Sequence, residues 1–517
     1  MAMELGFWRL SERDPDHVAV VTPEGREVTA GALLSAANRL VHGLRARGLR
    51  RGDAVAVVLR NDLPLLEVFL ACAQAGFYMA PINTHLAPPE IAYIVGDSGA
   101  KAVVCSPEVA DVCRTALDSI GFSGDGRFCT GDAPGFRPFS SLSAGQPDST
   151  PGDRVAGMPM TYSSGTTGRP KGVRRPIVAV DPETMAGGYA QFLMLFGMQP
   201  RDGSVHLVTS PLYHTAVLSF CSNHLHLGHR VVLMDKWTPE GTLERIERYG
   251  ITTTHMVPTQ FSRLLALPEA ERAGRKLGSL RQVIHSAAPC PVDVKRRMLA
   301  WWGPVIYEYY AASEGGGTLA RPGEWLEKPG TVGKAWPISK LRIVRDDGTE
   351  APAGEPGTVF MSMGQHRFEY HNDPKKTDGA WKGEFFTVGD VGYLDADGYL
   401  FLCDRKCDMI ISGGVNIYPA EIESVLLSHP EVADCAVFGI PDDDWGERIK
   451  AVVEPAPAAK AGPELAAAIL EFCKERLAAF KLPRSIDFTD AMPRDPSGKL
   501  YKRKLRDPYW VGRERAI

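Results

Sequence analysis

Short apolar runs alternate with amphipathic stretches of helical periodicity through the first four fifths of the sequence. The pattern is clearest where the runs 54–59, 78–82 and 102–105 are separated by the helix-like stretches 64–76 and 88–96. The same rhythm returns in the runs 205–209, 231–234, 251–256 and 282–285. Strands that alternate with helices are typical of layered α/β folds. The alternation therefore predicts a large body built around sheets.

The pattern becomes shorter and more mixed from about residue 404 onward. The elements expected there are a strand near Met409, a helix from Pro419, strands near Ala436 and Ala451, and a helix over 463–480. Because 517 residues suffice for more than one hydrophobic core, we predict two domains. These are a large N-terminal α/β domain, 1–403, and a small, mobile C-terminal α+β domain, 404–517. The segment 123–153, rich in Gly, Pro, Ser and Asp, is expected to be a surface connection.

The charge balance favours small molecules as partners. Lys and Arg number 58 against 62 Asp and Glu, a net charge of −4, which provides no basic footprint for nucleic acid or an anionic membrane. The N-terminus lacks the continuous apolar core of a secretory signal, and the most apolar stretch, 63–82, is interrupted by Pro64 and Glu67. We therefore expect a cytoplasmic protein without a transmembrane segment, and leave a homodimer open.

Cysteine and histidine spacing gives little support for a metal site. The ten cysteines are scattered without paired spacing, so we expect them to be reduced and mostly buried. Cys403 and Cys407 lie four apart, but no second Cys or His pair stands at the spacing of a zinc site. His224, His226 and His229 have no carboxylate or cysteine partner at a recognisable spacing, and we interpret them as structural.

A loop rich in Ser, Thr and Gly is the first candidate for chemistry. It comprises Ser163, Ser164, Gly165, Thr166, Thr167, Gly168, Arg169, Pro170 and Lys171. Its glycines let backbone amides approach a ligand, and its hydroxyls and single ammonium group suit a polyphosphate. The spacing differs from that of P-loop NTPases, because Pro170 precedes Lys171 and Gly172 follows it. A polar hairpin explains the same composition equally well, so the loop alone leaves both interpretations open.

Together with motifs further along the chain, this loop resembles the signature of the adenylate-forming superfamily of acyl-CoA synthetases, firefly-type luciferases and peptide-synthetase adenylation domains. The further motifs, in the family's order, are Ser286-Ala287-Ala288-Pro289, Tyr310-Ala311-Ala312-Ser313-Glu314, Thr387-Val388-Gly389-Asp390, Asp404-Arg405, Ser412-Gly413-Gly414 and Pro493-Arg494-Asp495-Pro496-Ser497-Gly498-Lys499. The resemblance extends from about residue 10 to 505. It implies an ATP-dependent acyl-CoA synthetase, which converts a carboxylic acid to acyl-AMP and pyrophosphate and then transfers the acyl group to the thiol of coenzyme A.

The resemblance assigns the phosphates of ATP to the loop. Ser163, Thr166, Thr167 and Lys171 would hold the β- and γ-phosphates, and Glu314 with the hydroxyl of Thr166 would bind Mg²⁺ through hard oxygen ligands. Two anions must meet in this reaction, so cations and preorganised donors lower its barrier. Without the order of the motifs, Glu314 would be interpreted as a solvated loop acid.

The resemblance implies that later motifs bind the adenosine part of ATP. Tyr310 would stack on adenine, Asp390 would accept hydrogen bonds from the ribose hydroxyls, and Arg405 would donate to ribose or phosphate. The remaining nucleotide contacts implied by the resemblance are Ser164, Gly165, Gly168, Ala288, Pro289 and Ser313. Outside the family context, Tyr310 would be a core aromatic, and Asp390 and Arg405 would be surface charges.

The C-terminal motifs carry the remaining catalytic assignments. Lys499, alone a member of a solvated basic tail, would bridge the substrate carboxylate and the α-phosphate. For the second step the resemblance implies a rotation that brings the strand with Gly413 and Gly414 to the pantetheine arm of coenzyme A. The nucleophile is then the thiol of coenzyme A, so no cysteine needs to be catalytic. Many relatives have Asp or Lys two positions after the motif Arg as the hinge, whereas this chain has Cys407.

The acid is expected to contact His214, Ala287, Tyr309 and Ala311. His214 matches a family position beside the acyl and thioester sites, although a core histidine is the alternative. Ala311 stands where acetate-specific relatives carry Trp, so we expect a larger acyl group. Tyr309 could narrow one wall or turn outward. Fatty or bulky alicyclic acids are favoured, and aromatic acids are the alternative.

Three rival functions share these motifs. An enzyme that loads a carrier protein is the nearest, although no carrier domain is expected after Ile517. A luciferase-like oxygenase would need an oxidisable substrate. A nucleotide sensor without catalysis would not require Lys499 at the carboxylate, so the presence of Lys171, Glu314 and Lys499 together favours an enzyme.

Overall fold

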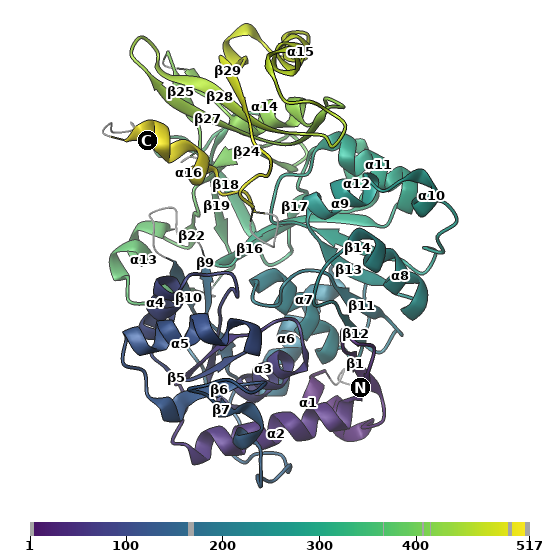
Figure 1. Ribbon diagram of the computed structural model, residues 1–517, viewed down its shortest axis with the longest axis vertical. Helices are drawn as coiled ribbons and strands as arrows, with labels where there is room; N and C mark the ends of the chain where they lie inside the picture. Colours follow the sequence, from purple (N-terminus) through teal and green to yellow (C-terminus); the bar gives the residue numbers. More distant parts are fainter. Residues whose placement is uncertain are drawn as a thin grey trace. The chain divides into compact units, whose positions relative to one another are not determined.

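The computed structural model describes residues 5–163, 170–364, 367–405, 408–413, 415–494 and 499–511. The chain forms two compact units, and Figure 1 shows the elements of both, coloured along the sequence. The first unit comprises Met1–His255, Pro268–Val283 and His366–Gly379, and the second comprises Met256–Leu267, Ile284–Gln365 and Ala380–Ile517. The predicted boundary between 403 and 404 stays a prediction. No helix of the described residues is both long enough and apolar enough to cross a membrane.

A six-stranded parallel sheet forms one layer of the first unit, in the order β7-β6-β5-β3-β4-β8. Its strands are β3 (Ala54–Val58), β4 (Tyr78–Pro81), β5 (Ala100–Cys105), β6 (Arg127–Cys129), β7 (Arg137–Pro138) and β8 (Met158–Pro159). The connecting helices are α3 (Leu63–Ala75), α4 (Pro88–Ser98) and α5 (Ala110–Ser119). Every residue of β3 is buried, as expected for a central parallel strand covered on both faces. The predicted alternation of strands and helices is confirmed here.

One expectation for this sheet was wrong. The segment 123–153 is not only a surface connection, because β6 lies within it and is fully buried. Arg127 at the start of β6 disguises the strand, since its guanidinium is held inside by Asp118 at 2.5 Å and by the carbonyl of Phe122. A three-residue strand that begins with a charge gives too short an apolar run to detect.

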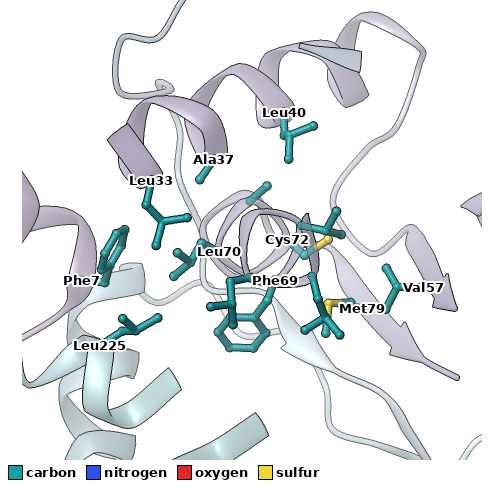
Figure 2. Close-up of a cluster of buried hydrophobic side chains, with 14 of the residues drawn as sticks. Phe7, Leu33, Ala37, Leu40, Val57, Phe69, Leu70, Cys72, Met79 and Leu225 are labelled. Carbon is teal, nitrogen blue, oxygen red and sulfur yellow. The ribbon is translucent and has the colours of Figure 1, made fainter. Parts of the chain in front are cut away.

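Apolar side chains of α2 (Ala30–Ala46) and α3 form the centre of the core beside this sheet. In Figure 2, Leu33, Ala37 and Leu40 of α2 point toward Leu70 and Cys72 of α3. Helix α2 begins at the N-cap Thr29, whose side chain accepts a hydrogen bond from the backbone of Ala32. Burial of this apolar face, at about 25 cal/mol per Å², stabilises the layer that carries the strands.

Five further strands of the first unit pair in the order β13-β11-β12-β1-β2. They are β1 (Val18–Val21), β2 (Glu27–Thr29), β11 (Val205–Val208), β12 (Arg230–Leu233) and β13 (Thr253–Met256). Helices α6 (Pro182–Met194), α7 (Thr215–His226) and α8 (Pro239–Tyr249) belong to the same part of the chain. The strands predicted at 205–209, 231–234 and 251–256 are confirmed, and their ends shift by one or two residues.

A small antiparallel sheet, in the order β20-β10-β9, completes the first unit. It consists of β9 (Thr161–Ser163), β10 (Lys171–Arg174) and β20 (Glu369–Tyr370), and helix α13 (Pro374–Ala380) follows. The segment between β9 and β10 contains the Ser/Thr/Gly loop. This sheet therefore carries the first motif of the candidate site.

The second unit contains a further antiparallel ladder and a sheet of six short strands. The ladder consists of β15 (Ile306–Ala312), β16 (Gly315–Ala320) and β17 (Lys334–Ala335), and β14 (Gln282–His285) precedes it in the chain. Helices α9 (Pro258–Leu265), α11 (Val292–Trp302) and α12 (Pro322–Glu327) accompany it. The sheet has the order β21-β22-β19-β23-β24, with β18 (Lys340–Val344) paired to β19 (Gly357–Ser362). Its other strands are β21 (Trp381–Lys382), β22 (Phe385–Phe386), β23 (Asp390–Leu394) and β24 (Leu400–Arg405).

The C-terminal part of this unit has the predicted mixed α+β character, with the strand order β26-β25-β28-β27 and β29 parallel to β28. Its elements are β25 (Ile410–Ser412), β26 (Val415–Ile417), α14 (Pro419–Leu426), β27 (Val432–Asp442), β28 (Gly446–Pro455), α15 (Pro463–Lys474), β29 (Ser485–Phe488) and α16 (Lys502–Arg506). The long strands β27 and β28 are visible in Figure 1. The helix predicted over 463–480 ends at Lys474, because the amide of Arg476 bonds three residues back to Cys473 and tightens the last turn.

Cysteines behave as predicted where they are described. Nine are free thiols, and seven of these are buried while Cys290 and Cys403 are half-buried. Cys407, the residue at the predicted hinge position, lies outside the described residues.

Candidate functional site

Strands β9 and β10 pair as an antiparallel hairpin, and the Ser/Thr/Gly loop joins them in the sequence. Lys171 pairs with Ser163 in the ladder, and Gly172 pairs with Tyr162. The predicted residues Ser164, Gly165, Thr166, Thr167 and Gly168 lie outside the described residues. The hairpin and the phosphate-binding interpretation are compatible, since paired strands can hold a ligand-binding loop between them.

Tyr162, directly before the loop, is anchored within the first unit. Its hydroxyl donates to the Asp97 carboxylate at 2.7 Å, and the side-chain amide of Asn372 donates to the carbonyl and the carboxylate of Asp97 at 3.2 Å each. Burial and the Asp97 carboxylate raise the pKa of Tyr162 well above its usual value. A Cβ atom at Gly172 would lie 2.9 Å from the Tyr162 ring, so the facing strand requires glycine there. Sequence reasoning missed this anchor, because its three residues are far apart in the chain.

Lys171 extends from β10 toward the neighbouring strand β20. Its ammonium group lies 4.8 Å from the centre of the Tyr370 ring, within the range of a cation–π contact. The backbones of β10 and β20 are joined by pairing of Val173 with Tyr370 and by a 2.8 Å hydrogen bond from the amide of His371 to the carbonyl of Gly172. The predicted phosphate-binding lysine thus lies on a strand that is hydrogen-bonded to β20.

His214 is the N-cap residue of α7 and is half-buried. Its ring lies 4.4 Å from that of Tyr213, and its positive charge would disfavour protonation of nearby His255. Burial lowers the pKa of His255 to about 3, so His255 is neutral at physiological pH.

Three other histidines of this unit, His206, His224 and His229, form a buried network. His224 Nδ1 lies 2.9 Å from His229 Nδ1, and His229 Nε2 lies 2.8 Å from the carbonyl of Gln199. His206 stacks on His224 with ring centres 4.1 Å apart. Burial lowers the pKa of each of these three histidines. Their ring nitrogens bond to one another and to the chain, which supports the structural interpretation of His224 and His229.

In the second unit, two predicted nucleotide residues contact each other. The hydroxyl of Tyr310, on β15, donates to the carboxylate of Asp390, on β23, at 2.6 Å. Asp390 is only 8% exposed, so this charge-assisted bond lies in a largely water-excluded place. A ring and a carboxylate predicted for adenine and ribose are therefore adjacent, although 80 residues separate them in the chain.

The predicted acyl-site residues of this unit lie on β15 and after β14. Tyr309 is buried, and burial raises its pKa to about 12 although a hydrogen bond with Ser286 opposes the shift. Whether Tyr309 narrows a wall of the acyl site stays a prediction. Ala311 is half-buried on the same strand. Ala287 has φ 73°, a left-handed conformation that strains a residue with a side chain and is frequent at functional sites.

Other predicted residues occupy the turns that follow β14 and β15. Ala288 and Pro289 come directly after Ala287, between β14 and α11. Ser313 and Glu314 form the turn between β15 and β16, which is closed by the pairing of Ala312 with Gly315. Glu314 is half-buried, and its predicted role as a Mg²⁺ ligand stays a prediction.

A buried ion pair beneath these strands was missed by sequence reasoning. Lys295, on α11, lies 2.7 Å from the carboxylate of Glu308, on β15, and both side chains are almost fully buried. His285 Nε2 lies 3.4 Å from the same carboxylate, and the Lys295 ammonium group is 4.5 Å from the centre of the Trp325 ring. Burial raises the pKa of Glu308, while Lys295 opposes the shift. Charges on an amphipathic helix are normally solvated, so nothing in the sequence marks this pair.

The motif residues around 404–414 are partly described. The backbone of Arg405 pairs with that of Asp390 in the β23–β24 ladder. The side chain of Asp404 accepts a 2.8 Å hydrogen bond from the amide of Ala420, in the first turn of α14. Gly413 has φ 58°, and a Cβ atom there would lie 2.4 Å from the ring of Trp445. Gly414 lies outside the described residues.

Lys499 directly precedes Leu500, which forms an isolated bridge with Arg494. Arg494 donates two hydrogen bonds to Asp434 of β27, at 2.5 and 2.7 Å. Lys499 itself is half-buried. The predicted catalytic lysine therefore lies next to a residue that is paired with a strand-anchored arginine.

Lys502 differs from its basic neighbours because its side chain is largely buried and forms an ion pair. Its ammonium group lies 2.9 Å from the half-buried carboxylate of Glu423. Burial alone would lower the pKa of Lys502, but Glu423, Asp404 and Asp408 raise it well above its usual value. The basic segment after Lys499 is thus not uniformly a solvated tail, as its composition suggested.

Two families match the sequence. Residues 7–366 match the family described as AMP-binding enzyme, and residues 421–499 match the AMP-binding enzyme C-terminal domain. A feruloyl-CoA synthase of Amycolatopsis sp is 34% identical over 510 residues, which cover 97% of this chain and 98% of that protein. A fatty acid–acyl-carrier-protein ligase of Streptomyces coeruleorubidus is 31% identical over 517 residues, covering 98% of this chain and 96% of that protein.

The fold is also similar to solved structures. The crystal structure of ATP-bound MatB from Rhodopseudomonas palustris has a TM-score of 0.83 and 30% sequence identity. The similarity covers 97% of this chain and 98% of the other. The likeness in sequence and in fold therefore extends over both units.

Proposed function

The chain belongs to the family of AMP-binding enzymes, and on this premise we propose that it joins a bulky carboxylic acid to coenzyme A through an acyl-adenylate. The family makes it an adenylate-forming acid–thiol ligase of the AMP-forming class, with ATP as its nucleotide. Coenzyme A as the acceptor, Mg²⁺ and the kind of acid belong to the proposal. The main support for the proposal is the hydrogen bond between Tyr310 and Asp390, because it brings together two nucleotide motifs that are far apart in the sequence.

The first step needs a leaving group on the acid. A carboxylate oxygen attacks the α-phosphorus of ATP, the bond from this phosphorus to the bridging oxygen breaks, and pyrophosphate leaves with the electron pair. We assign the β- and γ-phosphates to Lys171 and the loop, adenine to Tyr310, and the ribose to Asp390. Lys499 would hold the carboxylate against the α-phosphate, where a mobile ammonium group suits two anions.

Glu314 fits the expected ligand chemistry for Mg²⁺. It supplies a hard carboxylate oxygen from a tight turn, and the second proposed ligand, Thr166, lies outside the described residues. When bound, the cation would neutralise phosphate charge.

In the second step the thiol sulfur of coenzyme A attacks the acyl carbon. The bond between this carbon and the phosphate oxygen breaks, AMP leaves with the electron pair, and the thiol proton passes to water. Gly413 is the proposed contact to the pantetheine arm. Because the thiol belongs to coenzyme A, this step needs no cysteine of the chain.

For the acid we propose a fatty or bulky alicyclic acid first. Ala311 supports it, because an alanine on β15 leaves space for a large acyl group, and the carrier-protein ligase among the relatives acts on fatty acids. Tyr309, Ala287 and His214 are the other proposed contacts. An aromatic acid is the second candidate, and the 34% identity to a feruloyl-CoA synthase favours it.

A half-reaction assay tests the proposal. The protein is incubated with ATP, Mg²⁺ and a panel of fatty, alicyclic, aromatic and short acids, with and without coenzyme A, and pyrophosphate and thioester are measured. We expect pyrophosphate with at least one bulky acid and thioester only when coenzyme A is present. Absence of pyrophosphate with every acid would refute adenylation, and pyrophosphate without thioester would point to a carrier protein as acceptor.

The role of Lys499 separates the two steps. We expect Lys499→Ala to abolish acyl-adenylate formation while largely sparing thioester formation from preformed acyl-adenylate. Lys504→Ala, which removes an exposed ammonium group from α16, is the matched control and should leave both steps intact. Equal loss of both steps in Lys499→Ala would show that its assigned role is wrong.

A further inference from the structure

Lys502 is the first residue of the short helix α16, three residues after Lys499. Its side chain is only 13% exposed, whereas the neighbouring Arg503 and Lys504 are exposed. Lysine is rarely buried to this extent unless its charge is paired. The contacts of Lys502 therefore show which part of the protein holds the segment 499–506.

The partner of Lys502 is Glu423, on helix α14. The ammonium group lies 2.9 Å from Oε1 of this carboxylate. The same oxygen accepts a 2.7 Å hydrogen bond from the amide of Val437, on β27. Burial raises the pKa of Glu423, while Lys502 opposes this shift. The ion pair thus joins three elements, α14, β27 and α16, at a single carboxylate oxygen.

The charge of Lys502 is stabilised by more than one carboxylate. Asp404, near the end of β24, accepts a 2.8 Å hydrogen bond from the amide of Ala420 in the first turn of α14. Burial disfavours the charged form of Lys502, but Glu423, Asp404 and Asp408 together raise its pKa above the usual value. Lys502 is therefore charged at physiological pH, and the ion pair does not depend on a ligand.

The other contacts of the segment 499–506 reach different parts of the protein. The amide of Tyr501 donates to the carbonyl of Pro493 at 2.8 Å, and Leu500 forms the bridge with Arg494. These bonds join the segment to the chain that leads into it, whereas Lys502 joins it to α14. The ion pair therefore adds an anchor on an element that the backbone bonds do not reach.

We propose that Lys502 is a positioning residue for adenylate formation, which holds Lys499 in place through its ion pair with Glu423. The inference rests on the proposed function, because it takes Lys499 as the group that bridges the carboxylate and the α-phosphate. A lysine side chain is flexible, so the position of its ammonium group depends on how firmly the backbone behind it is held. A displacement of about 1 Å near a reacting group can lower a rate about 100-fold. Loss of the anchor should therefore slow the step that uses Lys499.

A direct contact with the phosphates of coenzyme A is the other role open to a basic residue after Lys499. The geometry disfavours this role for Lys502, because its ammonium group is largely buried and already bonded to Glu423. Binding a phosphate would require this ion pair to break. The KM for coenzyme A therefore distinguishes the two roles.

The test compares Lys502→Met with Lys481→Met. Both changes remove a lysine that pairs with a glutamate of α14, but Lys481 pairs with Glu421 at 2.7 Å and lies outside the segment 499–506. Acyl-adenylate formation is measured without coenzyme A, and thioester formation is measured from preformed acyl-adenylate. In Lys502→Met we expect kcat for acyl-adenylate formation to fall at least about tenfold, with the KM for ATP and thioester formation little changed. Lys481→Met should leave both steps intact.

Two further variants separate a positioning role from a general loss of structure. Lys502→Arg keeps the positive charge and should recover a substantial part of the rate. Glu423→Gln breaks the same ion pair from the other side, so it should show the same selective loss of acyl-adenylate formation even where Lys502→Met folds poorly. Recovery by neither charge nor partner, with equal loss of both steps in Lys502→Met and Glu423→Gln, would overturn the inference.

Hydrogen–deuterium exchange measures the anchoring whether or not an acid substrate is found. We expect the amides of the segment 499–506 to exchange faster in Lys502→Met than in the wild type, and no such change in Lys481→Met. Unchanged exchange in Lys502→Met would overturn the inference, as would a raised KM for coenzyme A with unchanged acyl-adenylate formation. A wild-type protein that forms no acyl-adenylate with any acid, together with faster exchange in Lys502→Met, would refute the proposed function and leave the anchor itself in place.

Discussion

Replacement of Lys295 by methionine should destabilise the protein far more than replacement of a surface lysine. Lys295 and Glu308 are a buried pair at 2.7 Å, with His285 at 3.4 Å from the same carboxylate. Methionine fills a similar volume but leaves the carboxylate without its cation. Removal of one partner of a buried pair costs about 3–5 kcal/mol, because the remaining charge stays in a water-excluded place.

The loss of stability in Lys295→Met depends on the groups that remain around Glu308. A protonated His285 could compensate only at the cost of charging a buried ring. The double variant Lys295→Met/Glu308→Gln removes both charges, so it should lose clearly less than the single variant. An amide at position 308 still needs a hydrogen-bond partner, and we expect a residual loss of about 1–3 kcal/mol.

The effect should depend on pH in a defined direction. Burial already raises the pKa of Glu308, and loss of Lys295 removes the group that opposes this shift. In Lys295→Met the folded state then keeps a proton that the unfolded state releases above about pH 4.3. Stability therefore falls as pH rises from this value to the folded pKa, by up to about 1.4 kcal/mol per pH unit. The double variant should lack this dependence.

Urea unfolding followed by tryptophan fluorescence at pH 5.5 and pH 8 measures these differences, since Trp325 adjoins the lysine. Lys340→Met is the matched control, because Lys340 pairs with Glu384 at 3.4 Å on the surface with both side chains at least half exposed. Such a pair is worth about 0–1 kcal/mol. A loss for Lys295→Met no larger than for Lys340→Met, or a loss that is greater at pH 5.5 than at pH 8, would refute the argument.

Three further predictions concern acid stability, ATP and the acid. Burial lowers the pKa of His206 to about 3, so the unfolded state binds a proton at this residue at a higher pH than the folded state does. The free energy of unfolding should therefore decline below about pH 6.5, by about 1.4 kcal/mol per pH unit. His206→Asn should reduce this decline, measured as the midpoint of urea unfolding against pH. Tyr310→Phe keeps the ring but removes the 2.6 Å bond to Asp390, so the KM for ATP should rise about tenfold in steady-state assays, and a KM within twofold of wild type would contradict this. Ala311→Trp should raise the KM for bulky acids at least about tenfold relative to short acids, and unchanged selectivity would argue against Ala311 as an acyl contact.

Runs of consecutive apolar residues predicted the buried strands, because strands that are buried on both faces of a sheet carry apolar side chains on both sides. The runs 54–59 and 282–285 correspond closely to β3 and β14. Such runs could not reveal β6, whose three residues begin with a charge, nor the end of α15, where apolar residues continue beyond the helix. Short elements and helix ends depend on tertiary hydrogen bonds, and a one-dimensional pattern does not contain them.

The motifs name candidate residues of the site, whereas the contacts between these residues come from the fold. The motifs named both Tyr310 and Asp390, but their direct hydrogen bond depends on how β15 lies against β23. A cavity lined by both Lys171 and Lys376 was not predicted, because Lys376 stands in no motif and the pairing of β10 with β20 cannot be inferred from the sequence. Residues far apart in sequence meet through sheet topology, which the motifs alone do not specify.

The glycines of the motifs have a second explanation that bears on how such motifs are interpreted. Glycine is expected at a ligand site because a backbone without a side chain permits close approach. At Gly172 and Gly413, however, the space for a Cβ atom is already occupied by a ring of the protein itself, that of Tyr162 or Trp445. Tyr162 is fixed by its bond to Asp97, whereas Trp445 is 57% exposed. Packing against a fixed ring therefore requires glycine at position 172, while at position 413 the left-handed φ of 58° favours glycine as well.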